Sequence, residues 1–498
     1  MIRFEFASLL RRRWLWALAG VLAAIPALVL AWLYWVMFPN LPQYKDDIAG
    51  LLSSATGYTI TFEAMDGDWG GARPRFTLEG VRISDGGRPL LYFTRLEGRF
   101  GWRTLTALEP RFHELSVEAP GLTVRRARDG LIHVGGIAVD PNSPDTSFSD
   151  WLLRQGRVRM QGATVAWVDD MRDSRPLILH DVSLHLQNLL NRHAFRVALS
   201  PPAHLSKPLE LSGVLYGRSL AKREAWHGKM TLKAPALELA SWRPWLPPEY
   251  ARARGHGSVE AELGIEQGRL SASDFKLNLA DLYVESPQLA APVDLARLTG
   301  SLGWVREKTI KAATAQTVHA RALALKGRSG VAVEPFDFSY RWGDGEQKVS
   351  AARLSLTPLA ALAPALPLEA SWRARIEELA PRGRFDSLEL RWRGDLSAPE
   401  NFSVDARFAG LGWAAREGRP GAADLSGMLA GNEEKGSYAI TGKQSGFDLP
   451  EFFAEPAFRF DILNVRGGWK RQKDRHYRFD IAEAMLSNAD FSAALSGR

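Results

Sequence analysis

The chain has 498 residues, of which 46% are hydrophobic and 24% charged, and this composition excludes an intrinsically disordered protein. It contains no cysteine, which excludes disulfides, thiolate metal sites and cysteine nucleophiles, and which suits an oxidising compartment. The formal net charge of +7 favours anionic partners, although an ordinary solvated basic surface would carry the same charge.

Near the N-terminus, residues 14–38 form an uncharged stretch, WLWALAGVLAAIPALVLAWLYWVMF, which follows three arginines at 11–13. A helix of these 25 residues would be roughly 37 Å long, which exceeds the ~30 Å hydrocarbon core of a bilayer. Tryptophan and tyrosine residues lie at its ends, as is typical of membrane interfaces. The sequence therefore predicts one transmembrane anchor over residues 14–38.

Two other interpretations of this stretch fit less well. A cleaved signal peptide has an apolar core of roughly 7–15 residues and a small-x-small cleavage site, and no such site follows Phe38. A buried helix of a soluble domain seldom runs so far without a charge. By the positive-inside rule, residues 1–13 are cytoplasmic and the rest of the chain lies across the membrane. We therefore expect lipid headgroups, and no nucleic acid, as the anionic partner.

After the anchor, residues 43–58 carry apolar side chains at helical spacing, and Gly57 is a typical C-terminal stop. This predicts one short amphipathic helix. From Thr59 onward apolar and polar residues alternate, which is typical of strands that bury one face. The first such strands are expected around residues 76–83 and 90–93, joined by a Ser-Asp-Gly-Gly turn.

Residues 140–150, DPNSPDTSFSD, have the composition of a linker, and we place a domain boundary there. A brief helical turn at 151–156 and further short strands follow. Only residues 242–252 and 358–368 interrupt the strand pattern, and no other convincing helix is expected. The sequence thus predicts a mainly β protein whose strands pack as sandwiches, close into barrels or form one long sheet.

A weak internal repeat occurs in the predicted strands. Four similar tripeptides begin them: Leu211 to Gly213, Leu298 to Gly300, Leu425 to Gly427 and Leu495 to Gly497. Their irregular spacing excludes a strict solenoid period. Glycine within a strand often marks a bulge or a close approach of two backbones, although 44 glycines also allow a chance recurrence.

Catalytic motifs are missing from the sequence. The ten histidines include no H-E-x-x-H spacing, and no nucleophile elbow or P-loop occurs. Gly255 to Gly257 lacks the third glycine of a dinucleotide fingerprint. The aspartates at 66–68 and 169–170 stand beside turns, where local hydrogen bonding is commoner than cation binding. We predict no enzyme, no cofactor and no metal site; a hydrolase that assembles distant carboxylates is the remaining catalytic alternative.

Alternation in the strands places apolar side chains on one face and polar ones on the other. In residues 336–342, for example, Asp337, Ser339 and Arg341 take the polar face. The candidates for an apolar lining are Phe336, Phe338, Tyr340, Trp342, Phe275, Leu277 and Leu279. Such a face is either a closed core or an open groove that lipid tails fill, at about 0.8 kcal/mol per buried CH₂. The anchor favours the groove, since it fixes the chain at a source of lipid.

Several motifs follow one another in a familiar order. They are the T-G at Thr56, the W-x-G at Trp69, the L-E-G-V at Leu78, the R-D-G at Arg128 and the SWRPWLP that begins at Ser241. In this order the chain resembles AsmA-like proteins, and most of all their YhdP-type branch. The resemblance covers essentially the whole chain and is strongest from Trp14 to Pro247.

The resemblance implies an inner-membrane protein of Gram-negative bacteria whose periplasmic part is a long, curved, taco-like antiparallel β groove with few short helices. Such proteins are implicated in moving phospholipid between the inner and outer membranes as bridges rather than enzymes. The implied partners are phospholipids, the inner membrane, and outer-membrane or other envelope proteins. A structural or assembly factor that binds envelope proteins is the alternative function.

The expected organisation combines these observations. It comprises a cytoplasmic N-terminus (1–13), the transmembrane anchor (14–38), an AsmA-like helix and β domain (39–139), a linker (140–150) and an extended periplasmic β-groove region (151–498). Members of this branch are usually much longer, so the groove region is expected to continue beyond the last residue of the chain.

Overall fold

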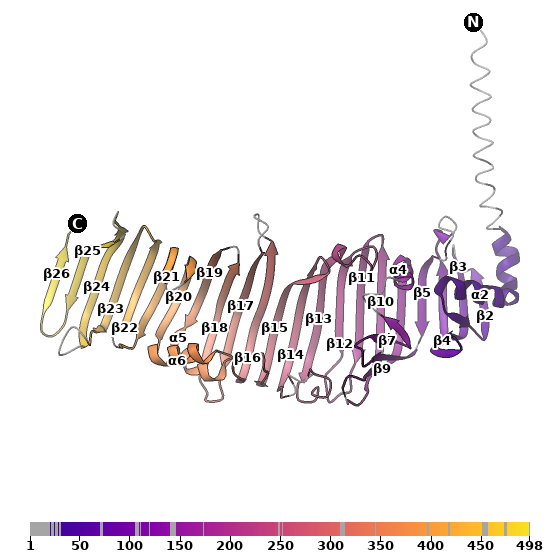
Figure 1. The fold of residues 1–498 in the computed structure, drawn as a ribbon, viewed down its shortest axis with the longest axis horizontal. Coiled ribbons are helices and arrows are strands. Elements are labelled where there is room, and N and C mark those ends of the chain that lie inside the picture. The colour runs from indigo at the N-terminus through magenta and orange to yellow at the C-terminus, as the bar shows by residue number, and fades with distance from the viewer. Residues whose placement is uncertain are drawn as a thin grey trace, which may run out of the picture. The chain divides into compact units, whose positions relative to one another are not determined.

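The structure is a computed structural model, and it is described for residues 20, 24, 28, 31–69, 73–104, 109, 111–118, 120–139, 146–172, 174–247, 250, 252–308, 314–343, 345–395, 398–416, 419–450, 457–472 and 476–497. The chain forms two compact units, Met1–Pro202 with Ser212–Trp226, and Ala203–Leu211 with His227–Arg498. Each consists mainly of β-strands with few short helices, which confirms the mainly β prediction (Figure 1).

Most of the predicted N-terminal anchor lies outside the described residues, as do residues 1–13. Within residues 14–38, the structure describes residues 20, 24, 28 and 31–38. Two short helical segments begin there, the π-helix η1 (Leu33–Met37) and the 3-10 helix η2 (Phe38–Tyr44). In the described part of the chain, no helix combines the length and the apolar character that a membrane span needs.

Helix α2 (Lys45–Thr56) confirms the short amphipathic helix predicted after the anchor. It ends at Gly57, whose φ of 77° is left-handed and whose N–H donates to the Ser53 carbonyl at 2.9 Å. Ile48 and Leu52 of the helix pack against a buried cluster of the first unit. This cluster consists of Leu41, Ile60, Phe62, Met65, Phe76, Leu78, Val81, Phe112 and Leu115.

The sheet of the first unit is mixed, which corrects the prediction of a purely antiparallel sheet. Its strands are β1 (Thr59–Thr61), β2 (Ala64–Trp69), β3 (Pro74–Asp85), β4 (Arg88–Phe100), β5 (Phe112–Glu118), β6 (Gly121–Arg126), β7 (Ile132–Val134), β8 (Ile137–Val139), β9 (Arg157–Asp169), β10 (Leu177–Leu189) and β11 (Arg192–Ser200). β9 pairs in parallel with both β5 and β6, and antiparallel with β10. The β3–β4 hairpin confirms the first predicted strands and the turn between them.

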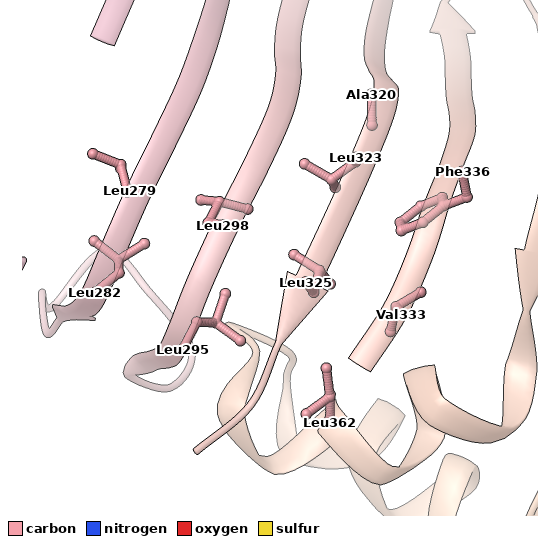
Figure 2. Close-up of a cluster of buried hydrophobic side chains, with 10 residues drawn as sticks. All are labelled: Leu279, Leu282, Leu295, Leu298, Ala320, Leu323, Leu325, Val333, Phe336 and Leu362. Carbon is pink, nitrogen blue, oxygen red and sulfur yellow. The ribbon is translucent and has the colours of Figure 1, made fainter. Parts of the chain in front are cut away.

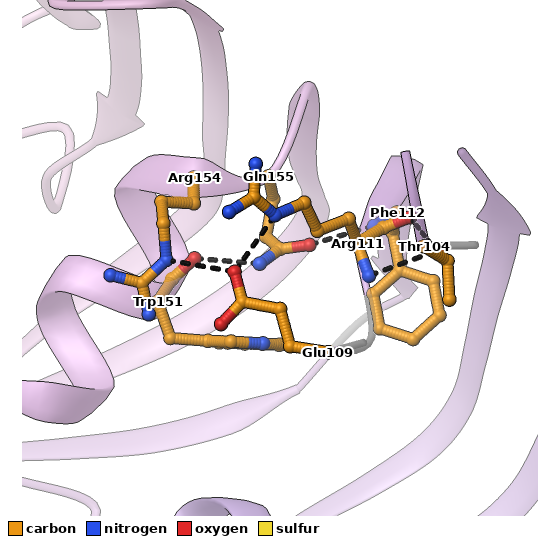
Figure 3. A network of polar contacts seen from close by, with 7 residues as sticks. All are labelled: Thr104, Glu109, Arg111, Phe112, Trp151, Arg154 and Gln155. Carbon is orange, nitrogen blue, oxygen red and sulfur yellow. Dashed lines mark hydrogen bonds and ion pairs between the residues drawn. The ribbon is translucent and has the colours of Figure 1, made fainter. Parts of the chain in front are cut away.

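Helix α4 (Ser147–Arg154) lies in the crossover that the parallel pairs require. It begins within the predicted linker, of which residues 140–145 lie outside the described part. Gln155, which is fully buried, fixes the helix to β5: its Oε1 accepts from the Phe112 N–H at 2.8 Å, and its Nε2 donates to the Trp151 carbonyl at 2.6 Å (Figure 3). Glu109 adds an ion pair with Arg154 at 3.2 Å.

Strand β12 (Leu209–Tyr216) has residues in both units, and the short 3-10 helix η3 (Arg223–Ala225) belongs to the first. The other strands of the second unit are β13 (His227–Glu238), β14 (Arg254–Glu266), β15 (Arg269–Val284), β16 (Val293–Lys308), β17 (Thr314–Lys326), β18 (Ala332–Gly343), β19 (Glu346–Ser355), β20 (Arg382–Asp395), β21 (Ala398–Trp413), β22 (Gly421–Asn432), β23 (Lys435–Asp448), β24 (Ala457–Arg471), β25 (Tyr477–Ser487) and β26 (Ser492–Ser496). From β13 to β26 each strand pairs antiparallel with the next one along the chain. Among the described residues, β26 pairs with β25 alone, so the sheet of this unit is open (Figure 1).

Three short helices interrupt this meander between β19 and β20. They are α5 (Leu356–Leu362), the 3-10 helix η5 (Ala363–Ala365) and α6 (Ala370–Leu379). The first two fall on the stretch 358–368 that was expected to interrupt the strands. Helix α6, which has no buried residue, was not predicted.

Two of the repeated tripeptides show why they contain glycine. Gly300 has a φ of 119°, and a Cβ there would lie 2.5 Å from the Ala322 carbonyl oxygen of the next strand. Gly427 has a φ of 154°, and its Cβ would lie 2.0 Å from the Ala439 oxygen. Any side chain would collide with the neighbouring backbone, so the predicted close approach is confirmed at these two positions.

Candidate functional site

The second unit carries its apolar side chains on one face of the sheet. Strand register places Phe275 opposite Leu302, Leu302 opposite Ala320, and Ala320 opposite Phe338. Opposite residues in antiparallel strands project from the same face. This row, here called the central row, comprises Phe275, Leu302, Ala320, Phe338, Ala351, Leu388 and Ala406. It crosses seven strands without a polar side chain.

All four aromatic candidates on β18 lie on this face, as the alternation predicted. Phe336 is opposite Leu323, Tyr340 is opposite Val318 and Trp342 is opposite Gln316. The candidates on β15 share the face as well, since Leu277 is opposite Gly300 and Leu279 opposite Leu298. The structure thus brings the seven candidates onto one continuous surface.

One end of this face is covered by α5. Leu362 of α5, 2% exposed, is directed towards the strand ends that carry Leu325 and Val333 (Figure 2). The buried cluster here consists of Leu279, Leu282, Leu295, Leu298, Ala320, Leu323, Leu325, Val333, Phe336 and Leu362. Phe336 and Leu279 therefore lie in a packed core, each 6% exposed, whereas Leu277 and Phe338 lie half-buried at its margin.

Away from α5, apolar side chains of the same face reach solvent. Phe275 and Val318 are 38% and 39% exposed. On the last two strands, Phe479, Ile481 and Leu495 are 66%, 50% and 60% exposed. These three side chains project from the same face, because Phe479 is opposite Trp469, Ile481 is opposite Gly467 and Leu495 is opposite Ala484. In the described part of the second unit, this face thus has two buried clusters, one under α5 and one around Leu425, Phe460 and Leu463, and apolar side chains elsewhere on it reach solvent.

The strand ends opposite α5 carry aromatic and amide side chains. Tyr340 stacks on Trp342 with ring centroids 5.2 Å apart, and on Trp392 at 6.4 Å. The Tyr340 hydroxyl donates to Gln347 Oε1 at 2.7 Å. Trp304 and Trp392, which the list of candidates missed, could have been found from the alternation of residues 302–304 and 388–392.

The opposite face of the sheet is polar and carries ion pairs. Lys348 pairs with Glu389 at 2.8 Å and Arg353 pairs with Asp337, while His319 Nε2 lies within hydrogen-bond distance of Asp274 Oδ2, at 2.8 Å. Hydrogen bonds from Lys348, and to a lesser degree from Arg391, lower the pKa of Glu389 in spite of its partial burial. The sheet is therefore amphipathic across its thickness, apolar on one side and charged on the other.

The acidic pairs singled out in the sequence have structural partners. Asp169 is 5% exposed and accepts from Arg126 Nε at 2.9 Å, while Asp170 pairs with Arg125 at 2.5 Å. Asp66 lies within strand β2 rather than beside the expected turn, and its Oδ1 accepts from the Gly67 N–H at 2.8 Å. Among the described residues, no group of His, Cys, Asp and Glu could hold a metal ion.

Comparison with known proteins identifies the family. Neither the curated proteins nor the solved structures gave a match. The family model described as YhdP protein matches residues 1–498, the whole chain. The motif order, the mainly β architecture and this match agree, and the chain belongs to the YhdP protein family.

Proposed function

We propose that this chain is a membrane-anchored lipid-transfer protein whose apolar sheet face holds phospholipid acyl chains and lets them move along it. The supporting observation is that apolar side chains of that face reach solvent at its two sides, at Phe275 and Val318 on β15 and β17 and at Phe479, Ile481 and Leu495 on β25 and β26. Acyl chains are suitable occupants because they cover apolar surface without demanding hydrogen bonds. Each CH₂ removed from water contributes about 0.8 kcal/mol.

The single-layered sheet suits conduction as well as binding. An apolar row such as the central row presents apolar contacts at each strand. The free energy of a bound lipid therefore changes little as the lipid moves from one strand to the next. Bulges bend the strands, and they coincide with left-handed residues such as Asp281 and Ala322. Such bending would make the apolar face concave and give a groove. The role we propose is therefore passive transfer rather than catalysis.

We further propose that residues 14–38 anchor the chain in the inner membrane, with residues 1–13 cytoplasmic and the bulk periplasmic. Trp32 and Trp35, at the far end of this stretch, are 52% and 72% exposed, as suits rings at a membrane interface. Alkaline phosphatase fused after Asp140 should be active in cells. Activity confined to fusions before Trp14 would contradict this topology.

Mass spectrometry of the purified full chain tests the transfer function. Phospholipid that co-purifies, and that exchanges into acceptor vesicles, is the expected result. A lipid-free protein with a stoichiometric protein partner would instead favour an envelope assembly factor. Turnover of an envelope substrate that one carboxylate substitution abolishes would favour a hydrolase.

A further inference from the structure

The apolar face of the second unit changes in character along its strands. At one end α5 covers the leucine cluster around Leu362, and in the middle lies the central row. Beyond the central row lies a second row, in which Val318 stands between Trp304 and Tyr340. Trp304 and Tyr340 each carry one polar atom in an otherwise apolar side chain. Outermost lies a row that we call the rim, consisting of Arg306, Gln316, Trp342, Gln347, Trp392 and Phe402.

The rim combines a cation, amides and indole rings. Arg306 is opposite Gln316, is exposed, and holds its guanidinium 5.0 Å from the centre of the Trp304 ring. Trp304 Nε1 donates to Gln316 Oε1 at 3.1 Å. Trp342 extends this aromatic surface on the next strand, opposite Gln316. Side chains of this kind, with an apolar body and a polar end, are those found at the level of lipid headgroups.

We propose that the rim is the headgroup side of the lipid site, so that each phospholipid lies with its phosphate near Arg306 and its acyl chains along the strands towards α5. This inference rests on the proposed lipid-transfer function and adds the orientation of the lipid and the chemical class of its headgroup. The guanidinium supplies donors that pair with phosphate oxygens. The central row supplies apolar contact for the tails, and α5 closes the far end.

The dimensions are consistent with this orientation. Residues two apart on a strand are about 6.8 Å apart, so three such steps from the rim to Phe336 span about 20 Å. Half the hydrocarbon core of a bilayer, the length occupied by one acyl chain, is about 15 Å. A tail that starts inside the rim therefore ends where Leu362 and Phe336 close the face.

Two photoreactive phosphatidylethanolamines test the orientation in the full chain, one with a diazirine on the headgroup and one with a diazirine at the acyl terminus. The headgroup probe should label peptides that contain Arg306, Gln316 or Gln347. The tail probe should label peptides around Leu302 and Phe338. Headgroup labelling at α5, or equal labelling by both probes, would overturn the orientation. If neither probe labels this face, the lipid-transfer function itself fails.

Arg306→Gln tests the headgroup class. Binding of phosphatidylglycerol vesicles should weaken by roughly two- to fivefold, the size expected for one exposed charge pair, while binding of diacylglycerol, which lacks phosphate, should stay unchanged. Arg321→Gln is the matched control, because Arg321 lies on the polar face with its guanidinium 3.8 Å from Asp274. Equal weakening by both variants, or an equal effect on both lipids, would overturn the role of Arg306.

Discussion

The two units use the same alternating strands but cover the apolar face differently. In the first unit, α2 and η2 lie on the sheet, and Leu78 of β3 is only 2% exposed. In the second unit α5 covers one end, while Val318 of β17, on the same kind of face, is 39% exposed. The strand pattern thus specifies an amphipathic sheet in both units. Whether its apolar face becomes a core or a surface depends on the helices that pack on it.

The largest effect on this difference between the units is expected from a charge placed in the covered face of the first unit. Leu78→Asp would bury a carboxylate without a partner, at a cost of several kcal/mol, and we expect the variant not to accumulate. The conservative Leu78→Met should cost less than about 1.5 kcal/mol and accumulate normally. Protein levels and urea unfolding measure both. Normal accumulation of Leu78→Asp would mean that this face is as accessible as that of the second unit.

A smaller loss is expected where α5 covers the second unit. Leu362→Ala leaves a cavity against Leu325 and Val333, and should lower the free energy of unfolding by about 2–4 kcal/mol. Ala361→Ser, at an exposed position of the same helix, should change it by no more than about 0.5 kcal/mol. Chemical denaturation compares the two. Equal stabilities would show that α5 does not close this end of the face.

The central row should respond in the opposite way, with a loss of lipid binding rather than of stability. Phe338 is half-buried, so we expect Phe338→Asp to cost about 1 kcal/mol or less and to resist protease like the wild type. Its carboxylate would displace acyl chains, and lipid binding should be lost. Phe338→Leu keeps the apolar surface and should keep the lipid. Parallel loss of abundance and binding in Phe338→Asp would place Phe338 in a closed core.

The smallest effect concerns pH and belongs to the first unit. Partial burial lowers the pKa of His113 from its ordinary 6.5, and the charges of Arg73 and Arg157 act in the same direction. Because the folded state binds this proton less readily than the unfolded state, stability is complete above pH 6.5 and declines as the pH falls below it. Urea midpoints at pH 7.5 and 5.5 should differ less for His113→Gln than for the wild type. An unchanged difference would contradict the assignment.

Much of this fold could be predicted from local sequence. The spacing of Ile48 and Leu52 with Gly57 as a stop specifies α2, and alternation places Phe336 to Trp342 on one face. The parallel pairing of β9 could not be predicted, because parallel and antiparallel partners need the same alternation along a strand. The covering of Phe336 could not be predicted either, because it depends on Leu362 of α5, a helix that follows the next strand along the chain.

The position of the rim could not be predicted from local sequence either. Trp304, Gln316 and Gln347 come from three strands, and only their register brings them into one row. Alternation identifies the face of a residue, but its row depends on bulges such as that at Ala322, which shift the pairing between strands. The headgroup side proposed here could therefore not be located from sequence alone.

The meander from β13 to β26 also bears on how this unit forms and varies. Each strand finds its partner in the adjacent hairpin, so pairing needs little closure of long loops and can propagate from hairpin to hairpin as the chain emerges. One more hairpin would lengthen the sheet by about 9.6 Å without disturbing the strands already paired. Homologues could therefore adjust their reach by gain or loss of hairpins.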